Sequence, residues 1–213
     1  MTQGTAASTD LAAAGIAVLV LAAGRSRRMA PRHKLLLPWR DGRPILRHVV
    51  IGALALRPLE TLVVVRPDLP ALGMVLDGLP VRLIGNPRWA EGLGTSLAAG
   101  IMALSPAAQA MLVLLGDAPD VRPEILTGLV TAFRAGTQPI AVPFYGDDPG
   151  PPTLFGRAVF PELLALRGDT GGRLIVRHYP EHVIRVPFPA AARPLDIDTP
   201  EDYEAALLTA GPG

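Results

Sequence analysis

Ile16-Ala-Val-Leu-Val-Leu-Ala-Ala-Gly-Arg-Ser-Arg-Arg-Met29 is the stretch that decides the fold, because an unbroken apolar run ends in small and basic residues. The run from Ile16 to Ala22 is rich in Val and Leu, which is typical of a parallel strand buried on both faces. The apolar run 110–115 predicts a second strand of this kind. Strands buried on both faces need a layer of helices on each side of their sheet.

Strand-length and helix-length segments alternate outward from this stretch. Up to residue 143 we expect strands at 16–22, 59–65, 81–84, 110–115 and 139–143, with helices at 44–56, 69–79, 94–104 and 123–134. Beyond it we expect a loop at 147–152, helices at 157–166 and 170–178, short strands at 183–186 and 195–197, and a last helix that starts at Asp198 or Thr199. The alternation predicts a doubly wound, mostly parallel sheet in a three-layer α/β/α sandwich of Rossmann-like type.

Composition excludes several classes of function. The chain has 213 residues, of which 49% are apolar and 18% charged, so it can bury the core of a single domain. A net charge of +1 does not support a broad grip on nucleic acid, and the lack of cysteine excludes disulfides, iron–sulfur clusters and a cysteine nucleophile. The uncharged run 11–24 is too short for a membrane span, and basic residues follow it rather than precede it. We therefore expect a cytoplasmic protein with no membrane or nucleic-acid partner.

The first loop of interest follows the strand at 16–22, at the carboxyl edge of the sheet where such folds bind ligands. Its small residues allow a ligand to approach the backbone, whose N–H groups can form an anion nest. Arg25, Arg28 and Lys34 add positive charge, and Lys34 is the only lysine among 20 basic residues. Neither Gly-x-x-x-x-Gly-Lys-Ser/Thr nor Gly-x-Gly-x-x-Gly is present. These residues fit a phosphate site, and they also fit a plain turn followed by a solvated arginine cluster.

Two further loops begin at the same predicted edge. The stretch 85–96 is rich in glycine and places Ser96 in the first turn of a helix, which suits either ligand binding or ordinary helix initiation. Asp117 directly follows a buried strand, where a carboxylate can reach a Mg²⁺ ion or simply cap a turn. Near the C-terminus, Asp196 and Asp198 alternate on one face of a predicted strand, so they suit a metal site, although Asp198 also suits a helix cap.

The motifs in these loops resemble those of a known family. Leu-Ala-Ala-Gly-x-Ser-x-Arg-Met at 21–29, followed by Lys-Leu-Leu-Leu-Pro at 34–38, is similar to the signature of the MobA-like NTP transferases. Within that family it looks most like the molybdenum cofactor cytidylyltransferases, since the guanylyl branch tends to Leu-Ala-Gly-Gly. The stretches 86–96, 117–119, 168–173 and 196–203 also resemble motifs of this family. The resemblance thus covers about residues 16–208 through five spaced motifs. It implies a nucleotidyltransferase fold.

The resemblance also implies a role for each motif. The catalytic residues would be Lys34, Arg28 and Asp117, and the nucleotide would contact Leu21, Ala22, Ala23, Gly24, Arg25, Ser26, Arg28, Lys34, Asn86, Gly92, Ser96 and Asp117. Mg²⁺ would bind Asp117 together with Asp198 as first choice or Asp196 as second. The acceptor would contact Gly150, Pro152, Gly168, Asp169 and Arg173. Two positions depart from the family pattern: Ala30 stands where a Gly is common, and Pro151 replaces a His of the acceptor loop.

The implied reaction transfers a nucleoside monophosphate from an NTP, with CTP expected, to the phosphate of molybdopterin, and releases pyrophosphate. A molybdoenzyme that receives the product is a further implied partner. We expect a disordered leader over residues 1–14 and a single domain over 15–210, whose nucleotide part is about 15–143 and whose acceptor part is about 144–210. Two alternatives stay open: a related nucleotidyltransferase that uses GTP or another phosphorylated acceptor, such as a sugar phosphate, and a non-catalytic cofactor carrier or insertion chaperone.

Overall fold

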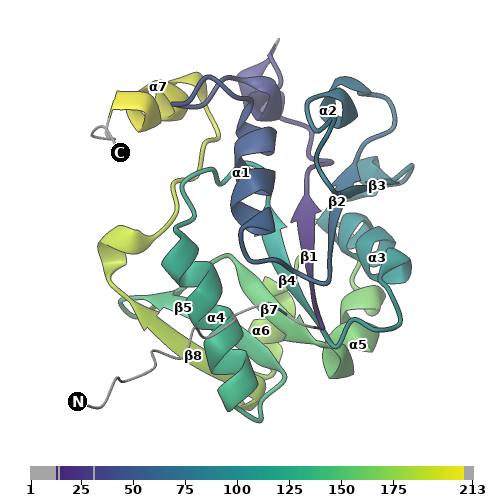
Figure 1. Ribbon diagram of the computed structural model, residues 1–213, viewed down its shortest axis with the longest axis vertical. Helices are drawn as coiled ribbons and strands as arrows, with labels where there is room; N and C mark the ends of the chain where they lie inside the picture. Colours follow the sequence, from purple (N-terminus) through teal and green to yellow (C-terminus); the bar gives the residue numbers. More distant parts are fainter. Residues whose placement is uncertain (1–12, 14, 31, 209–213) are drawn as a thin grey trace, which may run out of the picture.

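The computed structural model describes residue 13 and residues 15–30 and 32–208, in which one sheet lies between helices (Figure 1). Its eight strands run in the order β3-β2-β1-β4-β7-β5-β6, with β8 paired to β5. The strands are β1 Ile16–Leu21, β2 Glu60–Val65, β3 Arg82–Gly85, β4 Ala110–Leu115, β5 Ile140–Tyr145, β6 Asp148–Pro149, β7 Thr153–Gly156 and β8 Val183–Phe188. The α-helices are α1 Ile45–Leu54, α2 Ala71–Met74, α3 Leu93–Ala103, α4 Pro123–Ala135, α5 Phe160–Ala165, α6 Arg173–His178 and α7 Pro200–Leu208.

Strand β1 lies at the centre of the parallel part of the sheet. All six of its residues are buried, and it pairs in parallel with β2 on one edge and β4 on the other. Leu21 is in register with Val64 and Leu115, so the three strands end at nearly the same level. The loops that follow β1 and β4 therefore begin side by side at the carboxyl edge of the sheet.

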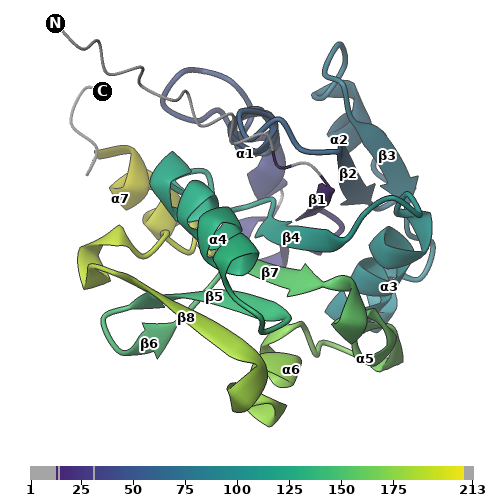
Figure 2. The ribbon, with the colours of Figure 1, turned by 60° about the horizontal axis from the view of Figure 1, so that its bottom comes forward.

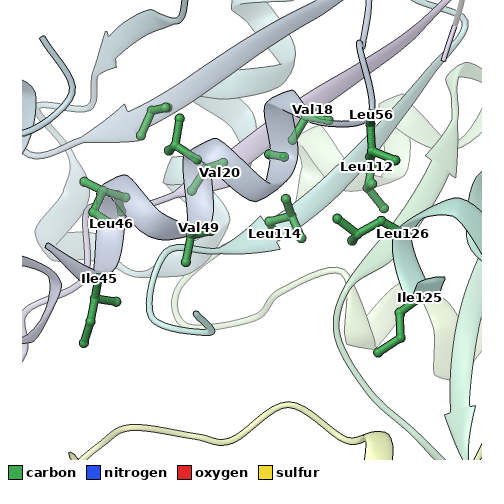
Figure 3. Packing of buried hydrophobic residues seen from close by; sticks show 14 of the residues in the cluster. Val18, Val20, Ile45, Leu46, Val49, Leu56, Leu112, Leu114, Ile125 and Leu126 are labelled. Carbon is green, nitrogen blue, oxygen red and sulfur yellow. The ribbon is translucent and has the colours of Figure 1, made fainter. Parts of the chain in front are cut away.

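Helices cover both faces of the sheet, because alternate residues of β1 point to opposite sides. Val18 and Val20 belong to a core cluster that includes α1 and α4, and Figure 3 shows these side chains packed together. Leu19 and Leu21 belong to a second cluster on the other face, built with α3, α5 and α6. Figure 2 shows the two helical layers on either side of the strands. This arrangement confirms the predicted three-layer α/β/α fold with a mostly parallel sheet.

The sheet departs from the sequence-based prediction at β7. Residues 153–156 form a strand that lies between β4 and β5 and runs antiparallel to both. The sequence does not predict this strand, because it has only four residues and follows a proline-rich turn. Within the segment 147–152, which was expected to be a loop, Asp148 and Pro149 form the short strand β6 against the end of β5.

Two other expectations were wrong. The helix expected at 69–79 shrinks to the four residues of α2, and Gly78 has a positive φ of 79° in the turns that follow. Residues 195–197 run past the sheet without joining any strand ladder. Of the expected leader, only Ala13 is among the described residues, and it is buried against the core. The remainder of that prediction lies outside the described residues. In the described ranges no helix is long and apolar enough to cross a membrane.

The close packing of α3 on β1 gives a test of the fold. A Cβ built on Gly100 in α3 would collide with both terminal methyl groups of Leu19, which is fully buried. A Cβ on Gly52 in α1 would meet no atom within 4 Å. Both changes to alanine gain helix propensity, of about 1 kcal/mol. We expect Gly100→Ala to lower the free energy of unfolding by about 1–3 kcal/mol, because overpacking outweighs that gain.

Chemical denaturation of the two variants beside the unchanged protein is the measurement. Gly52→Ala is the matched control and is expected to be neutral or stabilising. Equal stability of both variants would contradict the packing that the structure shows between α3 and β1.

Candidate active site

Two loops meet where β1 and β4 end. The Gly116 N–H donates to Leu21 O at 2.9 Å, which fixes the start of the β4 loop against the end of β1. A side chain at residue 116 would press on Leu21 O, at 3.1 Å, and on Leu46 Cδ1, at 3.2 Å, so a glycine suits this close approach. Asp117, the next residue, is thereby held beside the loop that follows β1.

The loop after β1 keeps one side open. Ala22 and Ala23 are buried, whereas Gly24 is exposed, and a Cβ added to it would meet nothing within 4 Å. Packing within the protein therefore does not require glycine at this position, and the space in front of it is free for a ligand. Ser26 has a positive φ of 49°, and its Oγ accepts the N–H of Lys34 at 2.9 Å. That hydrogen bond joins the loop to the segment that carries the lysine.

The ammonium group of Lys34 is the centre of the site. It forms an ion pair with Asp117, lies 3.1 Å from Asp198 Oδ1 and donates to Ile197 O at 3.0 Å. Only 13% of its side chain is exposed. Burial by itself lowers the pKa of Lys34, but the carboxylates of Asp117 and Asp198 outweigh this effect and raise the pKa above its ordinary value. The lysine is therefore positively charged at neutral pH.

The two C-terminal acids lie beside this lysine. Asp198 also pairs with Arg28, whose Nη1 is 2.8 Å from Asp198 Oδ2, so it contacts both predicted phosphate-binding cations. Burial raises the pKa of Asp196, and the nearby charges of Asp117 and Asp198 raise it further. The structure thus brings together Arg28, Lys34, Asp117, Asp196 and Asp198 from three distant parts of the sequence.

The donor set at this site fits a divalent cation that also binds phosphate. Asp117 and Asp198 both approach the Lys34 ammonium, and their side chains are 30% and 45% exposed. Mg²⁺ in nucleotide enzymes takes one or two carboxylate oxygens, with substrate phosphates and water as its other ligands. Among the described residues, no group of three His, Asp or Glu side chains is arranged to hold a metal by itself. Asp117 and Asp198 are therefore a partial ligand set that substrate oxygens would complete.

The loop after β3 is stabilised by the polar residues that the sequence suggested for the base. Asn86 is buried, and its Nδ2 donates to Thr95 Oγ1 at 2.9 Å and to Ser96 Oγ at 3.0 Å. Its Oδ1 accepts the N–H of Arg88 at 2.9 Å. The hydrogen bond between Asn86 and Ser96 therefore stabilises the loop. Their contact with a base stays a prediction.

Gly92 joins this loop to a segment predicted for the acceptor. Its φ is 114°, and a Cβ there would collide with the backbone of Gly168 and Asp169. The N–H of Gly94 also donates to Gly168 O at 3.0 Å. The predicted nucleotide loop and the predicted acceptor loop therefore lie in direct backbone contact, with no room for a side chain at Gly92.

The first and second loops also make a contact that the sequence does not predict. Arg25 Nη2 donates to Ala90 O at 2.7 Å, and its guanidinium lies 5.3 Å from the ring centre of Trp89. Arg66 lies over the same ring at 3.6 Å. Trp89 lies within the stretch 86–96 that resembles the family, but nothing in the sequence indicated which cations it would meet. This cluster fixes the first loop against the second.

A pocket of about 300 Å³ opens beside the charged residues. It is lined by apolar side chains that include Leu97, Val113 and Phe155. Asp196, which interacts electrostatically with Lys34, also lines it. Three arginines also line it, Arg173, Arg177 and Arg193. The pocket is therefore an apolar hollow with cationic walls next to the predicted phosphate site.

The predicted acceptor residues divide into two groups. Gly150 and Arg173 line the pocket, whereas Pro152, Gly168 and Asp169 do not. Pro151, the position where the sequence departs from the family pattern, does line it. Arg177 and Arg193 were missed, since isolated arginines in an arginine-rich chain give no signal of their own.

The chain is similar to known proteins over most of its length. The MobA-like NTP transferase domain matches residues 18–183. The bifunctional protein GlmU of Rhodospirillum rubrum is 34% identical over 145 residues, a stretch that covers 67% of this chain and 31% of that protein. The chain thus spans about a third of the length of the curated relatives that it matches.

Solved structures agree with this match. The Rv0371c protein of Mycobacterium tuberculosis has a TM-score of 0.79 and 30% identity, over 90% of this chain and 97% of that one. Its complex with manganese is also similar, with a TM-score of 0.74. A nucleotidyl transferase from Methanothermobacter has a TM-score of 0.76 and 25% identity, over 90% of this chain and 95% of that one. With a family match that covers more than half of its residues, this chain belongs to the MobA-like NTP transferase domain family of nucleotidyltransferases.

Proposed function

We propose that this protein is a divalent-metal-dependent nucleotidyltransferase. The observation that carries the proposal is the position of the Lys34 ammonium, which contacts Asp117 and Asp198 between an open loop of small residues and an apolar pocket. In the proposed reaction an acceptor phosphate oxygen attacks the α-phosphate of an NTP, the bond to the β-phosphate breaks, and pyrophosphate leaves. The protein supplies no nucleophile, so positioning and charge neutralisation provide the rate enhancement.

Lys34 and Arg28 are proposed to hold the triphosphate and the departing pyrophosphate. Both cations contact Asp198 in the structure, and Arg28 is largely exposed. A triphosphate offers stronger anionic partners than one shared carboxylate, so it can draw these cations away from Asp198. The exchange would leave Asp117 and Asp198 free to face a cation.

Asp117 and Asp198 are proposed to bind Mg²⁺, with Asp196 as the second choice for the C-terminal ligand. Their distribution around Lys34 fits a partial ligand set, and the similar Rv0371c protein was solved with manganese. A bound divalent cation supplies charge neutralisation at the phosphates. Asp198 remains the first choice because it contacts both Lys34 and Arg28, the cations proposed to hold the phosphates.

The pocket beside the site is proposed to bind the acceptor, and we propose molybdopterin phosphate as that acceptor and CTP as the donor. The apolar side chains of Leu97, Val113 and Phe155 suit a flat ring system better than a bare sugar phosphate. Arg173, Arg177 and Arg193 suit its anionic groups. The sequence Leu-Ala-Ala-Gly at 21–24 supports CTP as the donor, because it resembles the cytidylyl branch of the family. With this function the protein would act in the cytoplasm and hand its product to a molybdoenzyme.

A change at Asp117 tests the reaction class. We expect Asp117→Asn to reduce turnover by about 10³-fold or more, because loss of a metal ligand costs several kcal/mol of the barrier. Glu181→Gln is the control, since it makes the same carboxylate-to-amide change on an exposed acid just before β8, at the opposite edge of the sheet. Pyrophosphate release at saturating Mg²⁺ is the measurement. Near-normal turnover of Asp117→Asn would remove this residue from the mechanism.

A substrate screen tests the proposed donor and acceptor. Pyrophosphate release is measured with each of four NTPs, with molybdopterin, with a sugar phosphate and with no acceptor. We expect pyrophosphate release only with molybdopterin. We also expect a higher kcat/KM for CTP than for GTP, because protein groups that hydrogen-bond to cytosine are left unpaired when another base binds. Equal values for CTP and GTP, or preference for the sugar phosphate, would favour the related nucleotidyltransferase. Nucleotide binding with no release under any condition would favour a carrier.

A change at Lys34 tests the phosphate grip. We expect Lys34→Ala to weaken CTP binding by about 10–100-fold, the loss of one hydrogen bond to a charged group. Lys34→Arg should also bind more weakly, because a planar guanidinium cannot keep the contacts of one ammonium with Asp117 and Ile197 O while it also faces a phosphate. Calorimetry gives the affinity, and a melting curve shows whether the variant is folded. Arg82→Ala, at the start of the edge strand β3, is the control. Unchanged CTP affinity in Lys34→Ala would mean that the arginines of the loop after β1 bind the phosphates instead.

A further inference from the structure

His33 precedes the central lysine and contacts the loop of small residues. Its Nε2 lies 3.2 Å from Gly24 O, and the next residue, Lys34, donates its backbone N–H to Ser26 Oγ at 2.9 Å. Two adjacent residues therefore hold both ends of the segment 24–26. The family resemblance gave His33 no role, and the proposed reaction does not use it.

The contact determines which nitrogen of the ring carries a proton. A carbonyl oxygen only accepts hydrogen bonds, so Nε2 must donate to Gly24 O. The other nitrogen, Nδ1, is buried and has no hydrogen-bond partner among the described residues. Burial lowers the pKa of His33, and the charges of Arg66 and Lys34 lower it further, whereas the bond to Gly24 opposes the shift. At neutral pH the ring is therefore a neutral donor at Nε2 alone.

This donor fixes the direction of one peptide group. The peptide bond between Gly24 and Arg25 is trans, so its C=O and N–H point in opposite directions. Because the carbonyl points to His33, the N–H of Arg25 points away from the ring. Within the described residues, the N–H groups of Gly24, Arg25 and Ser26 have no protein acceptor, so they are available to a ligand. The free space in front of Gly24 gives that ligand room.

We propose that His33 is a positioning residue for the triphosphate, which acts by holding the Gly24 carbonyl away from the phosphates so that the Arg25 N–H faces them. This inference rests on the proposed nucleotidyltransferase function. If the peptide group turned over, a carbonyl oxygen would face the phosphate oxygens, and repulsion would replace a hydrogen bond. Glycine at residue 24 makes such a turn sterically easy, which is why a side chain is needed to prevent it.

The experiment compares variants that keep or remove the donor. His33→Leu removes it, and His33→Gln keeps an amide N–H that can reach the position of Nε2. His182→Leu, just before β8 and at the opposite edge of the sheet, is the matched control. Calorimetry measures the affinity of each protein for CTP, inorganic triphosphate and cytidine, and steady-state assays give KM and kcat.

We expect His33→Leu to weaken binding of CTP and inorganic triphosphate by at least about tenfold, with KM raised and kcat changed by less than about threefold. Cytidine binding should not change, because the nucleoside has no phosphate. His33→Gln and His182→Leu should each lie within about threefold of the unchanged protein. If His33→Leu does not fold, His33→Phe keeps the ring shape without the donor and takes its place.

Two results would overturn the inference. One is that the unchanged protein and the donor-free variant bind inorganic triphosphate with equal affinity, or that neither binds it. The other is a loss in His33→Gln as large as that in His33→Leu, which would mean that ring packing and not the donor matters. Failure of the proposed function has a different signature, since no NTP would then release pyrophosphate in the unchanged protein. The triphosphate binding test needs no turnover, so it decides the role of His33 in that case as well.

Discussion

The buried ammonium of Lys34 is the interaction on which the rest of the site depends. It contacts Asp117 after β4 and Ile197 and Asp198 before α7, so one charge joins segments that are more than 80 residues apart along the chain. A lysine that is mostly buried is tolerated only when carboxylates compensate its charge. The same requirement explains why residues 195–198, which join no strand, nonetheless lie against the carboxyl edge of the sheet.

The architecture was predictable where the sequence carries a physical constraint. Strands β1 and β4 are buried on both faces, which demands uninterrupted apolar runs, and such runs are visible in a single sequence. The carboxyl edge could be located because parallel strands all end there. Strand β7 could not be found, since four residues contain too few alternations to distinguish a strand from a turn. The strand predicted at 195–197 was wrong for the same reason, because two alternating acids give a strand-like pattern in a segment that pairs with no strand.

The site was predictable as a set of motifs but not as a set of contacts. Lys34, Asp117 and Asp198 were identified by position, and the structure brings their charged groups together. Asn86 was chosen as a ligand contact, yet its polar atoms are engaged by Thr95, Ser96 and Arg88, because a buried amide must be satisfied locally. The contacts of Trp89 with Arg25 and Arg66 could not be predicted, because cation–π contacts between distant residues produce no recognisable sequence pattern.

The contact of Gly92 with Gly168 limits how the two loops can move relative to each other. The two backbones touch with no side chain between them, and the Gly94 N–H holds Gly168 O. Because no side chain separates the two loops, neither can shift far without moving the other or breaking the hydrogen bond between Gly94 and Gly168.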